Sequence, residues 1–217
     1  MSPAAEHAAA PVIRPLGESA LLIQLPDDVR PGRAPALAAR LRESPPAGVL
    51  DAVAAYETVA VYFDPLACSP QELGDLLMRE VRDVPAATRE SAIEHVIPVV
   101  YDGEDLDSVA ARTGMSRAEV VEIHAGRAYT VSAIGFVPGF AYLDELDDRL
   151  RIPRRDTPLA RVPAGSVAIA SAQTAVYPLT TPGGWHIIGR TEARMFDASR
   201  SPPSLLAVGD SVRFVAA

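Results

Sequence analysis

Residues 166–190, SVAIASAQTAVYPLTTPGGWHIIGR, consist of short runs of β-forming residues separated by turn residues. The runs at 166–170, 174–179 and 185–189 are rich in Val, Ile, Thr and aromatic residues, which favour strands. Glycine and proline separate the runs, and the apolar residues show no helical period. Short strands divided in this way are typical of a β-barrel with long loops, which this stretch predicts.

The same pattern continues on both sides of this stretch. Further β-type runs lie at 129–136 and 211–215. Residues 105–127 are predicted to be helical, in two pieces divided at Gly114. We therefore predict a closed or nearly closed β-barrel domain over residues 92–217.

The first part of the chain has a different pattern. Its predicted elements are, in order, strands at 12–14 and 20–25, a helix at 34–41, a strand hairpin at 49–63 and a helix that begins at Ser69. Ser69 and Ser116 are each followed by Glu three residues later, a capping pattern that predicts a helix start at both serines. Helices interleaved with strand pairs predict a ferredoxin-like domain over residues 11–88, so the fold class is expected to be α+β.

Three segments lie outside or between these domains. Residues 1–10 are expected to form a disordered tail, and residues 85–91 are expected to form a linker. A strand is predicted at 94–100. It either completes the first sheet or begins the second domain, and the sequence leaves both interpretations open.

The charged residues exclude several kinds of function. The 217 residues include 20 Lys+Arg and 28 Asp+Glu, for a net charge of −8. All 20 cations are arginine, which excludes a lysine-containing phosphate loop, a Schiff base and a Ser-Lys pair. The acidic balance argues against nucleic acid or an anionic membrane as a partner. Residues 151–217, with eight Arg against four acids, form the part that would attract a small anion.

The rest of the composition predicts a cytoplasmic protein without a bound metal. Cys68 is the single cysteine, so the chain forms no internal disulfide. No apolar stretch approaches the roughly 20 residues of a membrane span, and the N-terminus lacks the pattern of a signal peptide. The four histidines are scattered, with no second ligand at i+2 or i+4.

One apolar segment is a candidate for binding. Residues 134–143, IGFVPGFAYL, contain too few polar side chains for an ordinary loop. The segment is either buried in the core or forms the aromatic wall of a ligand pocket or a partner interface. In the second interpretation, the contact residues are Phe136, Pro138, Phe140, Tyr142 and Trp185.

The polar candidates form two groups. Arg154, Arg155 and Arg161 lie between prolines that stiffen the backbone, and they either bind a carboxylate or phosphate or belong to a solvated surface loop. The second group combines amide, hydroxyl and imidazole groups with paired glycines: Gln173, Thr174, Tyr177, Gly183, Gly184 and His186. His186 is either a general acid or base or a hydrogen-bonded structural residue.

Four strings in the chain resemble the signature segments of a known family. They are IGFVPGFAYL, PRRDTPLARVPAGSVAIA, AQTAVYPLTTPGGWHIIGRT and VGDSVRF, and the likeness runs in order over most of residues 12–216. The family is that of the B-type subunits of 5-oxoprolinase, also called allophanate hydrolase subunit 1 or the sporulation kinase inhibitor family, with carboxyltransferase subdomains C and D. The resemblance implies a ferredoxin-like domain followed by a cyclophilin-like β-barrel.

The resemblance also implies a function. The chain would work with a C-type subunit, which is a carboxyltransferase-domain protein, and with an A-type subunit, opening 5-oxoproline to glutamate at the expense of ATP. We expect a site shared with the C-type subunit and no turnover by this chain alone. The arginines would hold the small anionic substrate. Gln173, Thr174 and the amides of Gly183 and Gly184 would polarise its carbonyl, and His186 would donate or relay a proton.

Two alternatives remain open at this point. Instead of a 5-oxoprolinase subunit, the chain could be a regulator that inhibits histidine-kinase autophosphorylation. The other alternative is a subunit of urea metabolism, of the carboxyltransferase or allophanate hydrolase type. It also departs from the family pattern, with Ala168, Ser171 and Ala175 where glycine is usual and Leu159 where arginine is common. Added methyl groups at glycine positions would narrow a ligand pocket.

Overall fold

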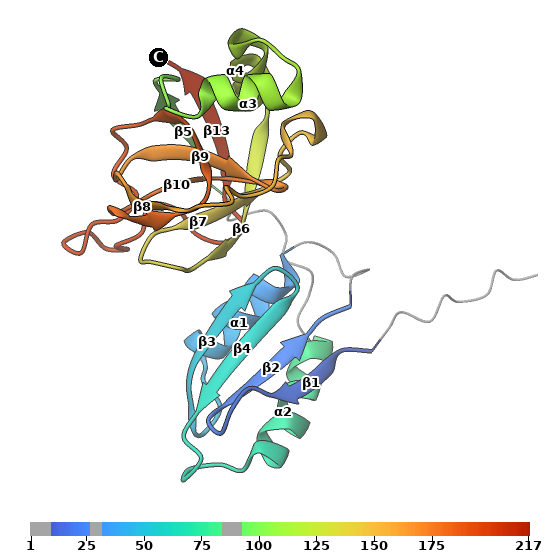
Figure 1. Ribbon diagram of the computed structural model, residues 1–217. Helices are drawn as coiled ribbons and strands as arrows, with labels where there is room; N and C mark the ends of the chain where they lie inside the picture. The colour runs from blue at the N-terminus through green and yellow to red at the C-terminus, as the bar shows by residue number, and fades with distance from the viewer. Residues whose placement is uncertain (1–9, 27–31, 84–92) are drawn as a thin grey trace, which may run out of the picture. The chain divides into compact units, whose positions relative to one another are not determined.

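A computed structural model describes residues 10–26, 32–83 and 93–217 of the chain (Figure 1). The chain divides into two compact units, residues 1–91 and 92–217. The expected linker at 85–91 lies outside the described residues, as does the expected tail except for its last residue, Ala10.

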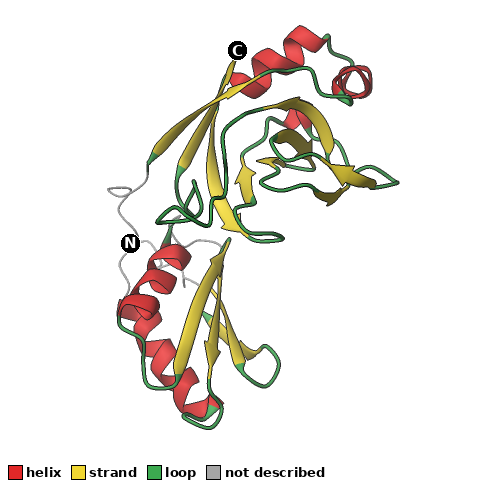
Figure 2. Cartoon of the chain, turned by 90° about the vertical axis from the view of Figure 1, so that its left-hand side faces the viewer, coloured by secondary structure: helices red, strands yellow, loops and turns green. Residues whose placement is uncertain are grey.

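The first unit is a four-stranded antiparallel sheet with two helices. Its elements are β1 (Val12–Pro15), β2 (Ala20–Gln24), α1 (Arg33–Glu43), β3 (Val49–Ala55), β4 (Thr58–Phe63) and α2 (Pro70–Asp83). The strands lie in the order β1-β2-β4-β3, and both helices lie on one side of the sheet (Figure 2). Leu37 and Leu41 of α1 and Leu77 of α2 share one buried cluster with Ile23 and Val61 of the sheet.

Short-range sequence signals explain where these elements begin and end. At the start of α2, the Glu72 backbone N–H donates to the Ser69 hydroxyl at 3.2 Å, and the Ser69 N–H donates to the Glu72 carboxylate at 3.3 Å. This reciprocal pair satisfies two amides that the helix itself leaves open. Tyr56, at φ 54°, lies in the turn of the β3–β4 hairpin.

The second unit contains most of the strands. Its elements are β5 (Glu94–Val99), α3 (Leu106–Thr113), α4 (Arg117–Ala125), β6 (Ala128–Ile134), β7 (Ala141–Asp144), the 3-10 helix η2 (Asp148–Leu150), β8 (Leu159–Val162), β9 (Ser166–Ala170), β10 (Gln173–Val176), β11 (Thr181–Gly183), β12 (His186–Arg190) and β13 (Ser211–Ala216). β5 pairs in parallel with β13, from Glu94 against Ser211 to Val99 against Ala216. The strand that the sequence left unassigned therefore belongs to the second unit.

The sheet of the second unit is mostly antiparallel. Its strands run β6-β7-β10-β9-β12, and β13 adds β5 to the other side of β6. Between β12 and the end of β5, the described residues form one isolated bridge, Val100–Arg190, and no continuous ladder. β8 and β11 form a separate two-stranded sheet. The fold is therefore mixed α and β with a largely antiparallel sheet.

Two predicted strands of the second unit are shorter than the sequence indicated. β6 ends at Ile134, because Phe136 takes a left-handed φ of 69°. β10 ends at Val176, two residues before Pro178, which has no N–H to donate to a ladder. The short strands β7, β8 and β11 were not predicted: β8 and β11 lie between the predicted β-type runs, and β7 begins in the apolar segment 134–143.

Candidate functional site

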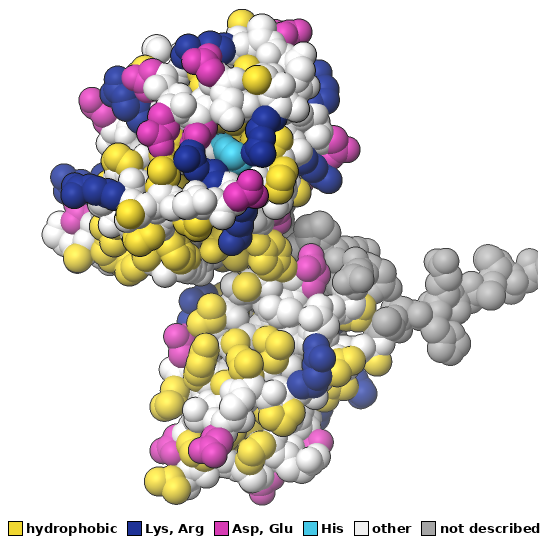
Figure 3. Space-filling view, viewed as in Figure 1, with side chains coloured by type: hydrophobic (Ala, Val, Ile, Leu, Met, Phe, Trp, Pro, Cys, Tyr) yellow, Lys and Arg dark blue, Asp and Glu magenta, His cyan; other side chains and the backbone are white. Residues whose placement is uncertain are grey.

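Residues 153–155 and 184–186 lie against each other in the second unit. The Arg155 backbone N–H donates to the Gly184 carbonyl at 2.8 Å, and Nε2 of His186 donates to the Pro153 carbonyl at 2.9 Å. These two hydrogen bonds bring Arg154 and Arg155 beside His186. Figure 3 shows arginine side chains gathered on the face of the second unit that carries β8 and β9.

A third segment, the loop before α3, joins this pair. The Arg155 guanidinium forms an ion pair with the carboxylate of Asp105, which is 7% exposed. The other oxygen of Asp105 accepts from the Ile187 N–H at 2.8 Å, and the Asp105 N–H donates to the Ile187 carbonyl at 2.9 Å. Sequence reasoning missed Asp105, because an acid directly before a helix is usually an ordinary capping residue.

Aromatic side chains form the floor under these arginines. The Arg154 guanidinium lies 6.0 Å from the ring centroid of Trp185, in the range of a cation–π contact. Trp185 is 5% exposed and packs edge-on against Phe140, with centroids 5.7 Å apart, and against Tyr142 at 6.0 Å. Phe140 also contacts Tyr177 edge-on at 5.3 Å.

Gly183 must be a glycine for this cluster to close. A Cβ at this position would collide with the Tyr177 hydroxyl and lie 2.9 Å from the ring carbon that bears it. Burial raises the pKa of Tyr177, while a hydrogen bond with the Trp185 backbone acts in the opposite direction. The glycine therefore lets the 183–185 segment lie directly on the Tyr177 ring.

His186 has one ring nitrogen without a partner. The side chain is 3% exposed, and Nδ1 is buried with no hydrogen-bond partner among the described residues. Because a carbonyl only accepts, the bond to Pro153 places the proton of the neutral ring on Nε2 and leaves the lone pair on Nδ1. An unpaired buried acceptor costs about 1–3 kcal/mol, so a donor placed against this nitrogen would be stabilised.

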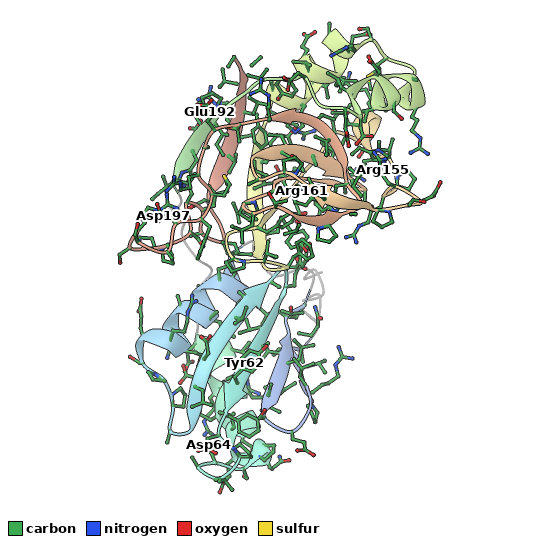
Figure 4. The ribbon with its side chains drawn as sticks, turned by 60° about the vertical axis from the view of Figure 1, so that its left-hand side comes forward. Tyr62, Asp64, Arg155, Arg161, Glu192 and Asp197 are labelled. Carbon is green, nitrogen blue, oxygen red and sulfur yellow. The ribbon has the colours of Figure 1, made fainter. Side chains whose placement is uncertain are left out.

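Three of the predicted polar residues lie apart from this arrangement. The Gln173 amide donates to Asp144 at 2.6 Å. Thr174 is fully buried, where its hydroxyl contacts Nε2 of His124 at 2.8 Å and donates to the Ala168 carbonyl at 3.1 Å. The Arg161 side chain is exposed on β8 and forms no hydrogen bond or ion pair with any residue that the structure describes. Figure 4 shows Arg155 and Arg161 as separate side chains of the second unit.

The apolar segment that we singled out divides into two parts. Phe140 is buried and Tyr142 half-buried, and both belong to the aromatic floor. Phe136 is 61% exposed, although its ring also meets Phe140 edge-on at 5.5 Å, and Pro138 is exposed beside it. The segment is therefore partly core and partly surface.

A cavity of about 590 Å³ opens elsewhere on the second unit. It is lined by residues 164–165, 177–179 and 191–198, and Tyr177 is the one predicted site residue among them. In Figure 4, Glu192 and Asp197 of this cavity lie on the side away from Arg155. Hydrogen bonds from Ser199 and Arg194 lower the pKa of Asp197 to about 2. The cavity and the arginine site are thus two different places.

The described residues offer no metal centre. Within them, no group of three or more His, Cys, Asp and Glu side chains is placed to hold a metal ion. None of the helices in the described ranges has both the length and the apolar character needed to cross a membrane.

Comparison with known proteins gives the family. Residues 11–206 match the family model described as carboxyltransferase domain, subdomain C and D. The chain is 36% identical to the B-type subunit of 5-oxoprolinase from Bacillus subtilis (strain 168), covering 94% of this chain and 91% of that protein. The chain therefore belongs to the carboxyltransferase subdomain C and D family, and within it to the B-type subunits of 5-oxoprolinase. This confirms the family inferred from the four sequence strings.

Solved structures agree with this family. The crystal structure of TTHA0988 matches 95% of this chain with a TM-score of 0.81 and 39% identity. This chain spans 40% of the TTHA0988 chain. The Kluyveromyces lactis urea carboxylase matches all of this chain and 22% of its own, with a TM-score of 0.75 and 16% identity. That likeness concerns the fold alone.

Proposed function

We propose that this chain is the B-type subunit of an ATP-dependent 5-oxoprolinase, which opens 5-oxoproline to glutamate. The name of the Bacillus subtilis relative supports the reaction. The observation that carries the proposal is the Nδ1 of His186, which has no partner among the described residues, on a segment that lies against the one carrying Arg154 and Arg155. The site thus combines cations for a carboxylate with a nitrogen that accepts a proton.

The substrate carboxylate is proposed to bind the two neighbouring arginines. Guanidinium groups recognise carboxylates through paired N–H donors, and Arg155 is held in place by Asp105. Arg154 forms no ion pair with any described residue, so its charge is available to a ligand. Arg161 is a further cation, which we propose binds a phosphate group of an intermediate or an acidic residue of a partner subunit.

The proton transfer is assigned to His186. ATP phosphorylates the amide oxygen of 5-oxoproline and releases ADP, which weakens the ring C–N bond. Water then adds to the former carbonyl carbon, and the C–N bond breaks to leave an acyl phosphate. Nδ1 of His186 is buried in this chain, so we propose that assembly with the partner subunits opens it to the site. Neutral His186 then takes a proton from the attacking water on Nδ1 and passes it to the ring nitrogen as that bond breaks. A second water hydrolyses the acyl phosphate to the new carboxylate and phosphate.

The other predicted residues take supporting roles. The backbone N–H groups of Gly183 and Gly184 remain candidates for polarising the carbonyl. Gln173 and Thr174 hold β10 through Asp144 and His124, so we propose that they shape the site without touching the substrate.

Other subunits are proposed to complete the site. The chain has no lysine for a phosphate loop, so ATP is proposed to bind on a partner. The partners are a C-type subunit with a carboxyltransferase domain and an A-type subunit. The greater length of the TTHA0988 chain, of which this chain spans 40%, leaves room for such a companion.

Reconstitution tests this function. The chain alone should release no glutamate from 5-oxoproline and ATP, whereas the mixture with its C-type and A-type partners should release it with one ADP per turnover. Arg155→Ala should raise KM for 5-oxoproline by at least about tenfold. Arg190→Ala removes an exposed arginine that pairs with Asp102, and it should leave KM unchanged. An inactive complete complex would rule out the reaction, and activity of the lone chain would rule out the shared site.

Phe136 supports the proposal of a protein partner. A phenyl ring that is 61% exposed at a left-handed φ is a contact for a protein surface rather than for a small anion. Phe136→Ala should weaken assembly with the C-type subunit in size-exclusion chromatography, while leaving the fold intact. Phe140→Ala is a poor test, because Phe140 lies in the core.

Inhibition of a histidine kinase is the second candidate, since the same exposed ring would serve it. The test is phosphotransfer by a cognate kinase with and without the chain, using Phe136→Ala as the variant. Inhibition by the wild type that the variant lacks would support this role.

The finer fold assignments belong to the same proposal. The order β1-β2-β4-β3 with two helices on one side is compatible with a ferredoxin-like domain. The Val100–Arg190 bridge between β12 and the end of β5 is compatible with a cyclophilin-like barrel. We propose the cytoplasm as the compartment, since ATP and the partner subunits would be available there.

A further inference from the structure

We infer that Asp105 is the positioning residue of the anion site, fixing the Arg155 guanidinium and the backbone next to His186 in one arrangement. This inference rests on the proposed function and adds to it a residue that touches no substrate. It also assigns different tasks to the two arginines.

The position of Asp105 is determined by the backbone around it. The Gly103 N–H donates to the Ile188 carbonyl at 3.2 Å, and Asp105 exchanges two hydrogen bonds with Ile187. Gly103 lies so close to β12 that a Cβ on it would overlap the Ile187 carbonyl. Gly189 of β12 in turn lies close to the end of β5, since a Cβ there would lie 2.7 Å from the Val100 carbonyl oxygen. The hydrogen bonds to Ile187 thus hold the Asp105 carboxylate in place beside β12.

The ion pair is partly shielded from solvent. Asp105 is 7% exposed, and a buried carboxylate is costly unless each oxygen has a partner. One oxygen accepts from the Ile187 N–H and the other from Nη1 of Arg155. The carboxylate therefore needs Arg155 in this position, and Arg155 gives up much of its rotamer freedom.

Arg155 keeps donors for a ligand in this arrangement. A guanidinium has five N–H donors, and the side chain donates to Asp105 through Nη1. No Arg155 nitrogen is both buried and unpaired, so its remaining donors are open to solvent. Because Asp105 already fixes the Arg155 guanidinium, the side chain loses little conformational entropy when a carboxylate binds.

The two neighbouring arginines then have separate tasks. Asp105 neutralises the charge of Arg155, so Arg155 contributes geometry more than charge. Arg154 lies over Trp185 without an ion pair to any described residue and supplies the net positive charge. Lysine would therefore replace Arg154 with little loss, whereas it would not replace Arg155, whose planar fork matches a carboxylate.

The test compares two acids of the same loop in the reconstituted complex. Asp105→Asn keeps the shape but removes the charge that holds Arg155. Asp102→Asn is the matched control, because Asp102 forms an exposed ion pair with Arg190. We expect Asp105→Asn to raise KM for 5-oxoproline about tenfold with kcat changed less than about threefold, and Asp102→Asn to change neither. Equal KM values for the two variants, or a loss confined to kcat, would overturn the inference.

A second measurement separates this inference from the proposed function. In the isolated chain, the NMR signal of the Arg155 Nη1–H that donates to Asp105 should be resolved and slow to exchange with water, and Asp105→Asn should broaden it. If the complete complex proves inactive, the reaction is wrong, but this signal still decides whether Asp105 anchors Arg155. An unchanged signal would refute the anchoring.

Arg155→Lys covers the case in which Asp105→Asn does not fold. This variant keeps the charge beside Asp105 and should raise KM as much as the loss of Asp105, whereas Arg154→Lys should raise it less than about threefold. Equal effects at both positions would contradict the division of tasks.

Discussion

His124 of α4 is a fully buried histidine with partners on both ring nitrogens. The Thr174 hydroxyl donates to the Ala168 carbonyl, so it accepts from Nε2–H of His124. Nδ1 therefore carries the lone pair and accepts from the Tyr101 hydroxyl at 2.7 Å. Stacking on Phe214, with centroids 4.8 Å apart, completes the enclosure. The ring is thus held neutral in one tautomer.

Acid should destabilise the fold through His124. Burial lowers the pKa of His124 from 6.5 to about 3, so the unfolded chain binds a proton that the folded chain refuses. The contribution of neutral His124 to the free energy of unfolding is complete above about pH 6.5. Below that pH it falls by up to about 1.4 kcal/mol per pH unit. Urea unfolding between about pH 7 and about pH 5, followed by Trp185 fluorescence, should show this slope. NMR titration of the His124 ring nitrogens in that interval would contradict it.

Ser171 occupies a backbone conformation that favours glycine. Its φ is 53°, it is exposed, and its N–H donates to the Ile152 carbonyl at 2.7 Å. A residue with a Cβ in the left-handed region costs about 1–2 kcal/mol of strain, which glycine avoids. Glycine also makes the unfolded chain more flexible, and this offsets part of the stabilisation. Ser171→Gly should therefore stabilise the second unit by about 0.5 kcal/mol in urea unfolding. Ser199→Gly is the control, since it removes a hydroxyl bonded to Asp197 and should not stabilise.

Among the elements, the loop between β5 and α3 decides how the arginine site is built. It carries Gly103 and Asp105 and lies directly on β12, which begins at His186. Three segments distant in sequence therefore share one set of hydrogen bonds. A shift of this loop would move the Asp105 carboxylate away from both Arg155 and Ile187.

Two glycine substitutions should change the free energy of unfolding in opposite directions. Gly103→Ala places a methyl group against the backbone of β12 and should cost about 1–3 kcal/mol, measured by Trp185 fluorescence during urea unfolding. Gly74 lies inside α2 with open space around it, so Gly74→Ala should stabilise the first unit by about 0.5–1 kcal/mol. Circular dichroism at helix wavelengths follows this second variant. A stable Gly103→Ala protein would show that the loop does not need this close approach.

At the scale of the whole molecule, each unit has its own core. The first unit buries one cluster around Ile23, Leu37 and Leu77. The second buries a large cluster around Val99, Tyr129 and Phe214, and a smaller one around Phe140 and Trp185. Since Trp185 is the single tryptophan, its fluorescence reports on the second unit alone.

Residues 92–217 are therefore expected to fold when expressed by themselves. Their strands supply hydrogen-bond partners for one another, and β5 is held by β13 near the other end of the segment. The fragment should show a buried-tryptophan emission spectrum and one cooperative urea transition monitored by fluorescence. Emission typical of an exposed indole, with no transition, would mean that the second unit depends on residues 1–91.

The sequence by itself determined the local features. Capping pairs at Ser69 and Ser116 marked the starts of α2 and α4, because such pairs act within three residues. Gly114 separated α3 from α4, where it takes a left-handed φ at the helix end. The absence of lysine excluded several chemistries by composition alone, and the four strings identified the family.

Only the tertiary structure selected which residues act together. Asp105 meets Arg155 across 50 residues and Ile187 across 82, and no local pattern distinguishes it from the other acids of its loop. The sequence made Thr174 and His186 candidates for one site, yet Thr174 completes a buried polar chain with His124, whereas His186 keeps a buried nitrogen without a partner among the described residues. The physical reason is that hydrogen bonds and burial depend on distance in space, which sheet pairing determines and short sequence patterns do not encode.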